Sequence, residues 1–194
     1  MVTHCHVTAF LFGWLDYPWF NQAYVSGLTK RMSMERVKLM KVIHSPRFGQ
    51  VHYAEEQVIT FPQGLPGFET CTRYVLLPLD EQDEQPFYFL QSVEEGDLSF
   101  LVLNPLRFFP DYEVELSDAV VDKLQIEKPE DVSLFTTVTV RGALEEATTN
   151  LKAPLVINVP KRLGKQVVVE NKDYLLKQPL FVPENKQANA GQKG

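Results

Sequence analysis

The chain has 194 residues, of which 44% are hydrophobic, and a formal net charge of −6 at pH 7. This length is enough for one well-buried core and short for two, so we expect a single domain. The negative charge argues against a nucleic-acid-binding protein, and the chain contains no apolar run of roughly 18 residues that would predict a transmembrane helix. Cys5 and Cys71 lie far apart and form no C-x-x-C motif. That cysteine usage is typical of the reducing cytoplasm and argues against a disulfide framework or a zinc knuckle.

The first 38 residues differ from the rest of the chain. They mix aromatic residues with glycine and proline, and they show neither a clean hydrophobic period nor the charged start of a signal peptide. The strand-like pattern begins at Leu39, and Met32, Met34 and Met40 follow one another closely at this point. We therefore expect residues 1–38 to be an extension outside the native domain, with translation starting at one of these methionines.

From Leu39 onward, short segments rich in β-branched and aromatic residues alternate with turn signals, which is typical of an antiparallel barrel or sandwich. We predict one all-β domain over residues 39–183, mainly antiparallel and shaped like a small β-barrel. The expected strands are Lys41–His44, Gln57–Phe61, Tyr74–Leu79, Phe87–Val93, Ser99–Asn104, Tyr112–Leu116, Val132–Arg141, Leu155–Val159 and Gly164–Val169.

One short helix is predicted within this β pattern. Ser117 is a suitable N-cap for Asp118–Leu124, acids stand in its first turn, and Pro129 follows its end. A weaker helical turn is expected around Tyr53–Gln57. Residues 184–194 are polar and contain no apolar anchor, so we expect a disordered C-terminal tail.

The stretch Ile59–Glu69, with the sequence I-T-F-P-Q-G-L-P-G-F-E, combines two prolines and two glycines with three large apolar residues. Proline and glycine interrupt regular elements, because proline fixes φ and lacks a donor while glycine tolerates positive φ. A solvated linker has little use for Phe61, Leu65 and Phe68. We therefore predict a packed corner between two strands, with all three side chains facing the core.

Sequence motifs of known enzymes are missing. The chain contains no G-x-S-x-G, G-x-x-x-x-G-K-[ST], G-x-G-x-x-G or H-E-x-x-H sequence. His4-Cys5-His6 offers too few ligands for a metal and lies in the extension, and Cys71 has no neighbouring base. We predict no catalytic residues, no metal site and no cofactor.

Charged residues are distributed unevenly along the chain. Seven acids and no lysine or arginine lie between Arg73 and Arg107, and such a run either keeps a face solvated or steers the protein toward a basic partner. Two predicted strands flank a basic hairpin tip that contains Lys161, Arg162 and Lys165. These cations either keep an ordinary hairpin soluble or contact a phosphate or an acidic partner.

Five blocks of sequence resemble one known family, the flagellar assembly factor FliW. The resemblance covers roughly Lys41–Leu180, and the joint occurrence of the blocks in order is more specific than any one of them. The blocks are Phe61–Glu69 (F-P-Q-G-L-P-G-F-E), Leu76–Leu79 (L-L-P-L), Phe87–Glu94 (F-Y-F-L-Q-S-V-E), Asn104–Glu113 (N-P-L-R-F-F-P-D-Y-E), and T-x-N-L-K-A-P-L-V-I-N with G-K-Q-V within Thr148–Val167.

The resemblance implies a small β-barrel-like protein of the bacterial cytoplasm, monomeric when free and without catalytic activity. Members of the family bind flagellin and also CsrA, the RNA-binding translational regulator that represses flagellin synthesis. Free protein would hold CsrA off the flagellin message by allosteric antagonism, and accumulating flagellin would draw the protein away. Such a switch requires that the two partners compete or are coupled.

Candidate partner-binding residues follow from this implied function. An acidic side suits an RNA-binding partner, which presents a basic surface, whereas the helices of flagellin suggest an apolar groove. Core packing is the alternative role for the aromatic candidates. The candidates for CsrA are Glu94, Glu95, Asp97, Asp111 and Glu113, and those for flagellin are Phe108, Phe109 and Tyr112.

Two other functions are open on the sequence alone. One is a small-molecule-binding β-barrel or an unrecognised hydrolase, which a buried pocket with perturbed carboxylates would favour and a filled barrel would not. The other is direct nucleic-acid binding through Lys161, Arg162 and Lys165, which the net negative charge argues against.

Overall fold

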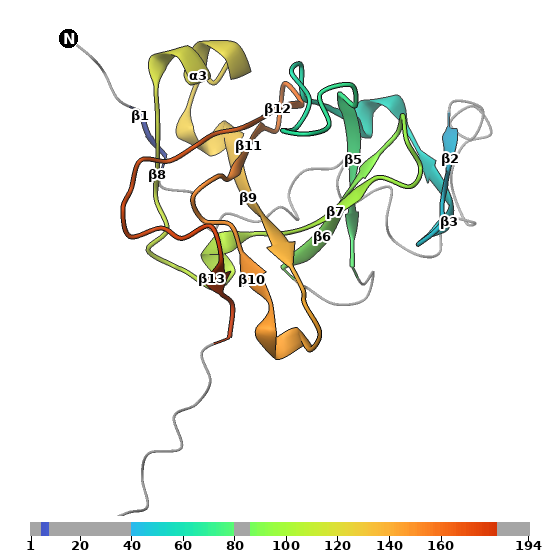
Figure 1. The fold of residues 1–194 in the computed structure, drawn as a ribbon. Coiled ribbons are helices and arrows are strands. Elements are labelled where there is room, and N and C mark those ends of the chain that lie inside the picture. Colours follow the sequence, from blue (N-terminus) through green and yellow to red (C-terminus); the bar gives the residue numbers. More distant parts are fainter. Residues whose placement is uncertain (1–4, 8–39, 80–85, 182–194) are drawn as a thin grey trace, which may run out of the picture.

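The computed structural model describes residues 5–7, 40–79 and 86–181, and its centre is a closed ring of strands (Figure 1). In their order around the ring, its strands are β11 (Leu155–Asn158), β12 (Leu163–Gln166), β4 (Ile59–Thr60), β5 (Arg73–Pro78), β6 (Phe87–Ser92), β7 (Ser99–Leu103) and β9 (Val132–Thr139). The ring closes because β9 pairs with β7 on one edge and with β11 on the other.

The pairings within this ring are antiparallel except for one. β12 runs parallel to β4 through the pair Leu163↔Thr60, and this contact closes the side of the barrel next to the corner. The fold class is therefore confirmed: the described chain is mainly antiparallel, barrel-like β structure.

The interior of the ring is filled by side chains. Phe61, Tyr74, Leu90, Val102 and Phe135 are each 0% exposed and belong to one hydrophobic cluster. Leu90 of β6 and Val102 of β7, the strands on either side of the Glu94–Asp97 turn, therefore lie in this core. A filled barrel does not favour the small-molecule alternative.

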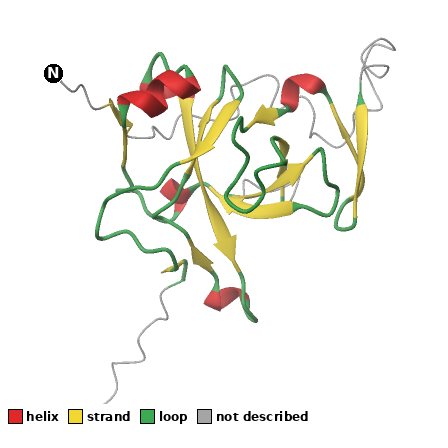
Figure 2. Cartoon of the chain, turned by 45° about the horizontal axis from the view of Figure 1, so that its top comes forward, coloured by secondary structure: helices red, strands yellow, loops and turns green. Residues whose placement is uncertain are grey.

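Smaller elements surround the ring (Figures 1 and 2). None of the helices in the described ranges is long and apolar enough to cross a membrane. On one side of the ring lies the hairpin of β2 (Lys41–Ser45) and β3 (Gly49–Tyr53), followed by the 3₁₀ turn η2 (Glu55–Gln57). On the other side lie β1 (Cys5–Val7), β8 (Val114–Leu116) and α3 (Asp118–Leu124). β10 (Thr148–Thr149) pairs with β9, and β13 (Gln178–Pro179) pairs with β10; the described chain also contains the 3₁₀ turns η3 (Pro105–Arg107), η4 (Pro129–Asp131) and η5 (Leu144–Glu146).

The predicted helix is confirmed with its predicted bounds, and η2 confirms the expected helical turn. Ser117 occupies the N-cap position, but its side chain makes no capping hydrogen bond. At the other end, Gln125 adopts a left-handed conformation with φ of 54°, and its N–H bonds the carbonyl groups of Asp122 and Val121, so backbone geometry ends the helix.

Several strand predictions were incomplete. β1, β3, β10 and β13 were not predicted, and β4, β8 and β12 differ from the expected strands in extent. β3 alternates between exposed Gln50 and His52 and buried Val51 and Tyr53. This is the pattern of a strand with one buried face, but too few of its residues are apolar for the run to stand out.

The predicted orientation of Phe68 was wrong. Phe61 and Leu65 are 0% and 4% exposed, whereas Phe68 is 39% exposed. Gly67 has a φ of 86°, which turns the chain just before Phe68 and directs its side chain outward. The ring then packs edge-on against Phe100, with 5.1 Å between ring centroids.

The predicted limits of the domain stay a prediction. The expected tail, residues 184–194, and most of the expected extension lie outside the described residues. Within the extension, Cys5–Val7 forms β1 and pairs with β8 through Cys5↔Leu116, His6↔Glu115 and Val7↔Val114.

Candidate functional site

The corner between β4 and β5 is built from two tight turns. The Gly64 N–H donates to the Phe61 carbonyl at 2.8 Å, and the Phe68 N–H donates to the Leu65 carbonyl at 2.7 Å. Gly64 has a φ of 64°, and an added Cβ atom would lie 2.6 Å from the backbone of Glu69. The turn geometry therefore requires glycine at this position.

The carboxylate of Glu69 stabilises the second turn. It accepts a hydrogen bond from the Gly67 N–H at 2.9 Å. This bond, together with the backbone N–H of Glu69 itself, holds the pKa of the Glu69 carboxyl below its ordinary value. The group is therefore charged at neutral pH and already has a partner within the corner.

The corner packs directly on β12. The ring of Phe61 covers Gly164 so closely that an added Cβ atom would lie 2.5 Å from it. The Thr60 N–H donates to the Arg162 carbonyl at 2.8 Å, and the Lys165 ammonium donates to the Gln63 side-chain oxygen at 2.7 Å. Two of the sequence blocks, F-P-Q-G-L-P-G-F-E and G-K-Q-V, therefore meet in one place.

A buried asparagine brings α3 to the same place. The Asn158 side chain donates to the carbonyl oxygens of Leu124 and Gln125, each at 2.8 Å. Its oxygen accepts from the Lys161 N–H at 3.2 Å. Asn158 thus joins the end of the helix to the β11–β12 hairpin and positions Lys123 beside β12.

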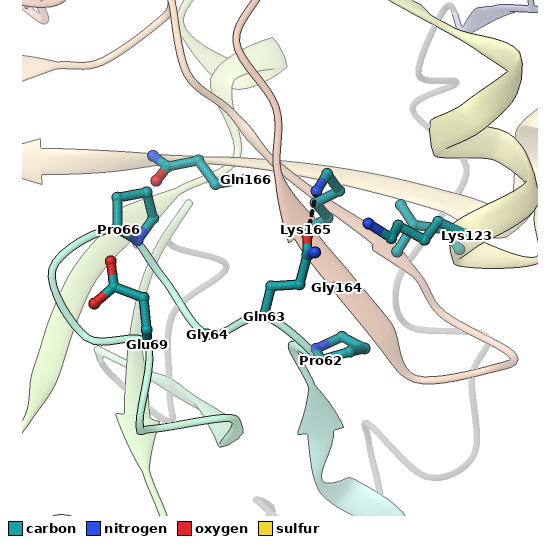
Figure 3. Close-up of a pocket in the computed structure, with 10 residues that line it drawn as sticks. Pro62, Gln63, Gly64, Pro66, Glu69, Lys123, Gly164, Lys165 and Gln166 are labelled. Carbon is teal, nitrogen blue, oxygen red and sulfur yellow. Dashed lines mark hydrogen bonds between the residues drawn. The ribbon is translucent and has the colours of Figure 1, made fainter.

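These contacts enclose a hollow of about 200 Å³ (Figure 3). Gln63 from the corner, Lys165 from β12 and Lys123 from α3 point toward one another, and Glu69 lies on the far side next to Pro66. The lining residues are Pro62, Gln63, Gly64, Pro66, Glu69, Lys123, Leu124, Gly164, Lys165 and Gln166.

The acidic residues proposed for CsrA fall into two groups. The loop between β6 and β7, which carries Glu94, Glu95 and Asp97, points toward β2 and β3, whereas Asp111 and Glu113 immediately precede β8 on the other side of the molecule (Figure 1). All five side chains are exposed. The structure therefore does not bring the predicted acidic side together as one surface.

The loop between β6 and β7 is firmly held. Buried Gln91 donates to the carbonyl oxygens of Gly96 and Leu98, each at 3.0 Å, and accepts from the Ser45 hydroxyl at 3.0 Å. Glu94 accepts from the backbone N–H groups of Thr72 and Arg73. Glu94 is thus part of the scaffold, whereas Glu95 and Asp97 form no ion pair with a described cation.

The aromatic candidates divide between surface and core. Tyr112 is 2% exposed and its hydroxyl donates to the Leu151 carbonyl at 2.6 Å, and burial raises its pKa. Phe108 and Phe109 are half-buried, and the ring of Phe108 lies 6.1 Å from that of Phe181. Core packing is therefore the role of Tyr112, while the two phenylalanines reach the surface.

The basic hairpin tip does not form one patch of free cations. Lys161 pairs with Glu127 at 2.9 Å, and this contact lowers the pKa of the Glu127 carboxyl. Lys165 donates to the Gln63 side-chain oxygen, so two of the three cations of the tip already have partners, while Arg162 stands in the turn itself with a φ of 54°.

Lys123 and Asn158 also belong to the site. They were not predicted, because their position beside the corner depends on contacts between distant parts of the chain.

The described residues contain no group of histidine, cysteine and acidic side chains that could hold a metal ion. Fold and site together define a class of protein: a small β-barrel filled by side chains, with a surface corner that brings α3, β4 and β12 together beside a hollow.

Comparison with known proteins assigns the family. The family model for FliW protein matches residues 41–180. Flagellar assembly factor FliW of Caldicellulosiruptor saccharolyticus is 40% identical over 148 residues, which are 76% of this chain and 94% of that protein. The corresponding protein of Natranaerobius thermophilus is 42% identical over 147 residues, covering 75% of this chain and 96% of its own length.

A solved structure agrees with this assignment. The crystal structure of a flagellar assembly factor FliW superposes with a TM-score of 0.69 at 40% sequence identity, covering 74% of this chain and 99% of that one. The chain belongs to the FliW family of flagellar assembly factors.

Proposed function

We propose that this protein is a non-catalytic flagellar assembly factor of the bacterial cytoplasm that binds flagellin and binds CsrA. As a monomer, it would antagonise CsrA repression of flagellin synthesis and exchange partners as flagellin accumulates. The observation that supports this role is the assembly of two family sequence blocks into one rigid corner on a filled barrel, in a chain about 40% identical to named flagellar assembly factors.

For CsrA, we propose contact through the carboxylates of the β6–β7 loop. Glu95 and Asp97 are exposed, and the hydrogen bonds of Gln91 hold the loop in one conformation. A preorganised acidic loop accelerates encounter with a basic partner and loses little conformational entropy on binding. Asp111 and Glu113 would act from the other side of the molecule, through long-range steering alone.

For flagellin, we propose contact through the aromatic cluster around Phe108 and Phe109. Phe108 also packs edge-on against Phe87, with ring centroids 5.6 Å apart, and Phe181 is 38% exposed. Half-buried rings can cover an apolar helix face without a large rearrangement.

The test is co-purification of the full chain with flagellin and with CsrA, first separately and then together. The proposal expects two binary complexes and release of CsrA as flagellin is added. Absence of both complexes would exclude the proposed function, and a stable ternary complex without release would exclude the exchange.

A further inference from the structure

The strand β8 has an edge that a segment of the N-terminal extension covers. Among the described residues, β1 is the one strand that pairs with β8, and Figure 1 shows it beside β8 on the side of the molecule away from β2 and β3. Val114 and Leu116 make no backbone hydrogen bond with any other described element. The register of the pair is Cys5↔Leu116, His6↔Glu115 and Val7↔Val114.

The backbone of β8 needs a partner at this edge. Val114 and Leu116 are buried and belong to one hydrophobic cluster. Buried N–H and C=O groups that lack hydrogen-bond partners are costly, and an edge strand can take these partners from any extended segment that fits, whether from its own chain or from another. The occupant of such an edge is a polypeptide, because the groups to be paired are the donors and acceptors of a strand.

The available length of this edge is three residues, Val114–Leu116. Before it, the Tyr174 hydroxyl accepts from the Glu113 N–H at 2.9 Å and donates to the Glu113 carbonyl at 3.1 Å. After it, the Ser117 carbonyl accepts from the first N–H groups of α3. A ladder of three residues contributes few hydrogen bonds, so the segment on β8 can open and exchange without unfolding of the core.

The family comparison separates the edge from its cover. The match to the FliW family model begins at residue 41, so β8 lies inside the matched part of the chain and β1 lies before it. The acceptor edge is therefore part of the family fold, whereas the strand that covers it here comes from outside the matched region.

The two faces of β8 define which segment fits. Side chains alternate along a strand, and residues opposite each other in an antiparallel pair lie on the same face. Val114 and Leu116 are buried, whereas Glu115 is exposed. A segment in this register therefore needs apolar residues opposite Val114 and Leu116, and a cation is favoured opposite Glu115. The sequence Cys-His-Val of β1 has this pattern, with histidine in the middle.

We propose that the β8 edge is a docking surface for an extended, antiparallel segment of a partner protein with the pattern apolar–basic–apolar, and that residues 5–7 occupy this surface in cis. The partner adds its strand to β8 in place of β1. The extension is then an intramolecular competitor that lowers the affinity for the partner. This surface is separate from the β6–β7 loop and from the aromatic cluster around Phe108 and Phe109.

The probe is the peptide acetyl-Thr-His-Ala-His-Val-Thr-Ala-amide, which corresponds to residues 3–9 with alanine in place of Cys5 to prevent oxidation. It is titrated to millimolar concentration into the isotope-labelled full chain, and amide chemical shifts and amide exchange are recorded. Binding at the proposed surface changes the shifts of Val114–Leu116 and leaves those of the β6–β7 loop unchanged.

A first variant removes the competitor. Successive N–H groups of a strand point to opposite edges, so His6→Pro combined with Val7→Pro deletes one donor toward β8 whichever residue supplies it. We expect faster exchange of the Val114 and Leu116 amides, and about tenfold tighter peptide binding if the edge is free in one unmodified molecule out of ten. Gln22→Pro combined with Ala23→Pro places the same two prolines in the extension outside β1 and should change neither.

A second variant and two further peptides test the charge preference. His6→Glu sets like charges opposite each other at Glu115, and it should also tighten peptide binding without introducing proline. Replacing the second histidine of the peptide by lysine should give about fivefold tighter binding than replacing it by glutamate, the size of a cross-strand charge pair. Glu115→Lys should reverse this preference.

The spectra show whether each variant is folded, and His6→Glu carries the test if the proline variant is not. Peptide binding without shift changes at Val114–Leu116, or no binding to any variant, would overturn the docking surface. Equal binding and equal exchange in the unmodified chain and in the β1 variants would overturn the competition by residues 5–7. A charge preference that Glu115→Lys leaves unchanged would overturn the assigned register.

Discussion

At the scale of single residues, Gly164 carries the contact between β12 and the corner. We predict that Gly164→Ala destabilises the protein by about 1–3 kcal/mol, the usual cost of overfilling a packed site, because the new methyl group would lie 2.5 Å from the Phe61 ring. Urea unfolding measures the change. Combining it with Phe61→Leu should give a smaller loss than the sum of the two single losses; strict additivity would mean that the two residues do not press on each other.

Asn158 is the second residue on which the site depends. We predict that Asn158→Ala lowers stability by about 2 kcal/mol, because it leaves the buried carbonyl group of Leu124 and the partly buried one of Gln125 without their donor. Amide exchange at the end of α3 should accelerate together with that at Lys161, whose N–H also bonds Asn158. Asn150→Ala removes a comparable turn contact elsewhere and should leave exchange in α3 unchanged. Unaltered protection of the helix end in Asn158→Ala would contradict this role.

At the scale of elements, η2 links the β2–β3 hairpin to the barrel by charge. Glu55 pairs with Lys41 of β2 at 2.6 Å and with Arg73 of β5. These partners lower the pKa of the Glu55 carboxyl from its ordinary value of 4.5. A lowered pKa in the folded state means that the ionised group stabilises the fold above pH 4.5, and that this contribution is lost as the pH falls through the folded-state pKa.

We therefore predict that Glu55→Gln costs about 0.5 kcal/mol at pH 7, a value kept small because the charges are partly exposed and screened. The difference from the unmodified protein should shrink toward zero in acid and in high salt. Glu56→Gln, at the neighbouring exposed carboxyl that forms no ion pair with a described cation, serves as the control for the loss of one acidic charge and should leave the stability at pH 7 nearly unchanged. A difference that stays constant between pH 7 and pH 3 would show that the effect is not electrostatic.

The same elements show what sequence can predict. The bounds of α3 were predictable because capping, acidic residues and Pro129 are local signals. The corner was predictable as a corner for the same reason, but the outward turn of Phe68 depends on positive φ at Gly67, which many glycines do not adopt. The hollow beside Lys123 was not predictable, since it requires Asn158 to bond a helix 34 residues earlier in the chain.

At the scale of the whole molecule, the two segments that carry the CsrA candidates lie on different sides (Figure 1): the β6–β7 loop with Glu95 and Asp97, and the segment before β8 with Asp111 and Glu113. Association rates respond to the charge nearest the contact, and their salt dependence reports how many charges take part. The two acidic groups therefore offer matched charge reversals at different places, with the same change in net charge. Glu94 is left intact in both, because its carboxylate bonds the backbone of Thr72 and Arg73.

We predict that reversing Glu95 and Asp97 to lysine slows association with CsrA at low salt by about tenfold or more, within the range by which electrostatic steering accelerates encounter. Reversing Asp111 and Glu113 should slow it much less, because only the overall field changes. Stopped-flow association at several salt concentrations measures both effects, and the two variants should converge as salt rises. Equal slowing by both pairs would place the effect in net charge alone, and slowing by the second pair only would move the proposed contact to the side of β8.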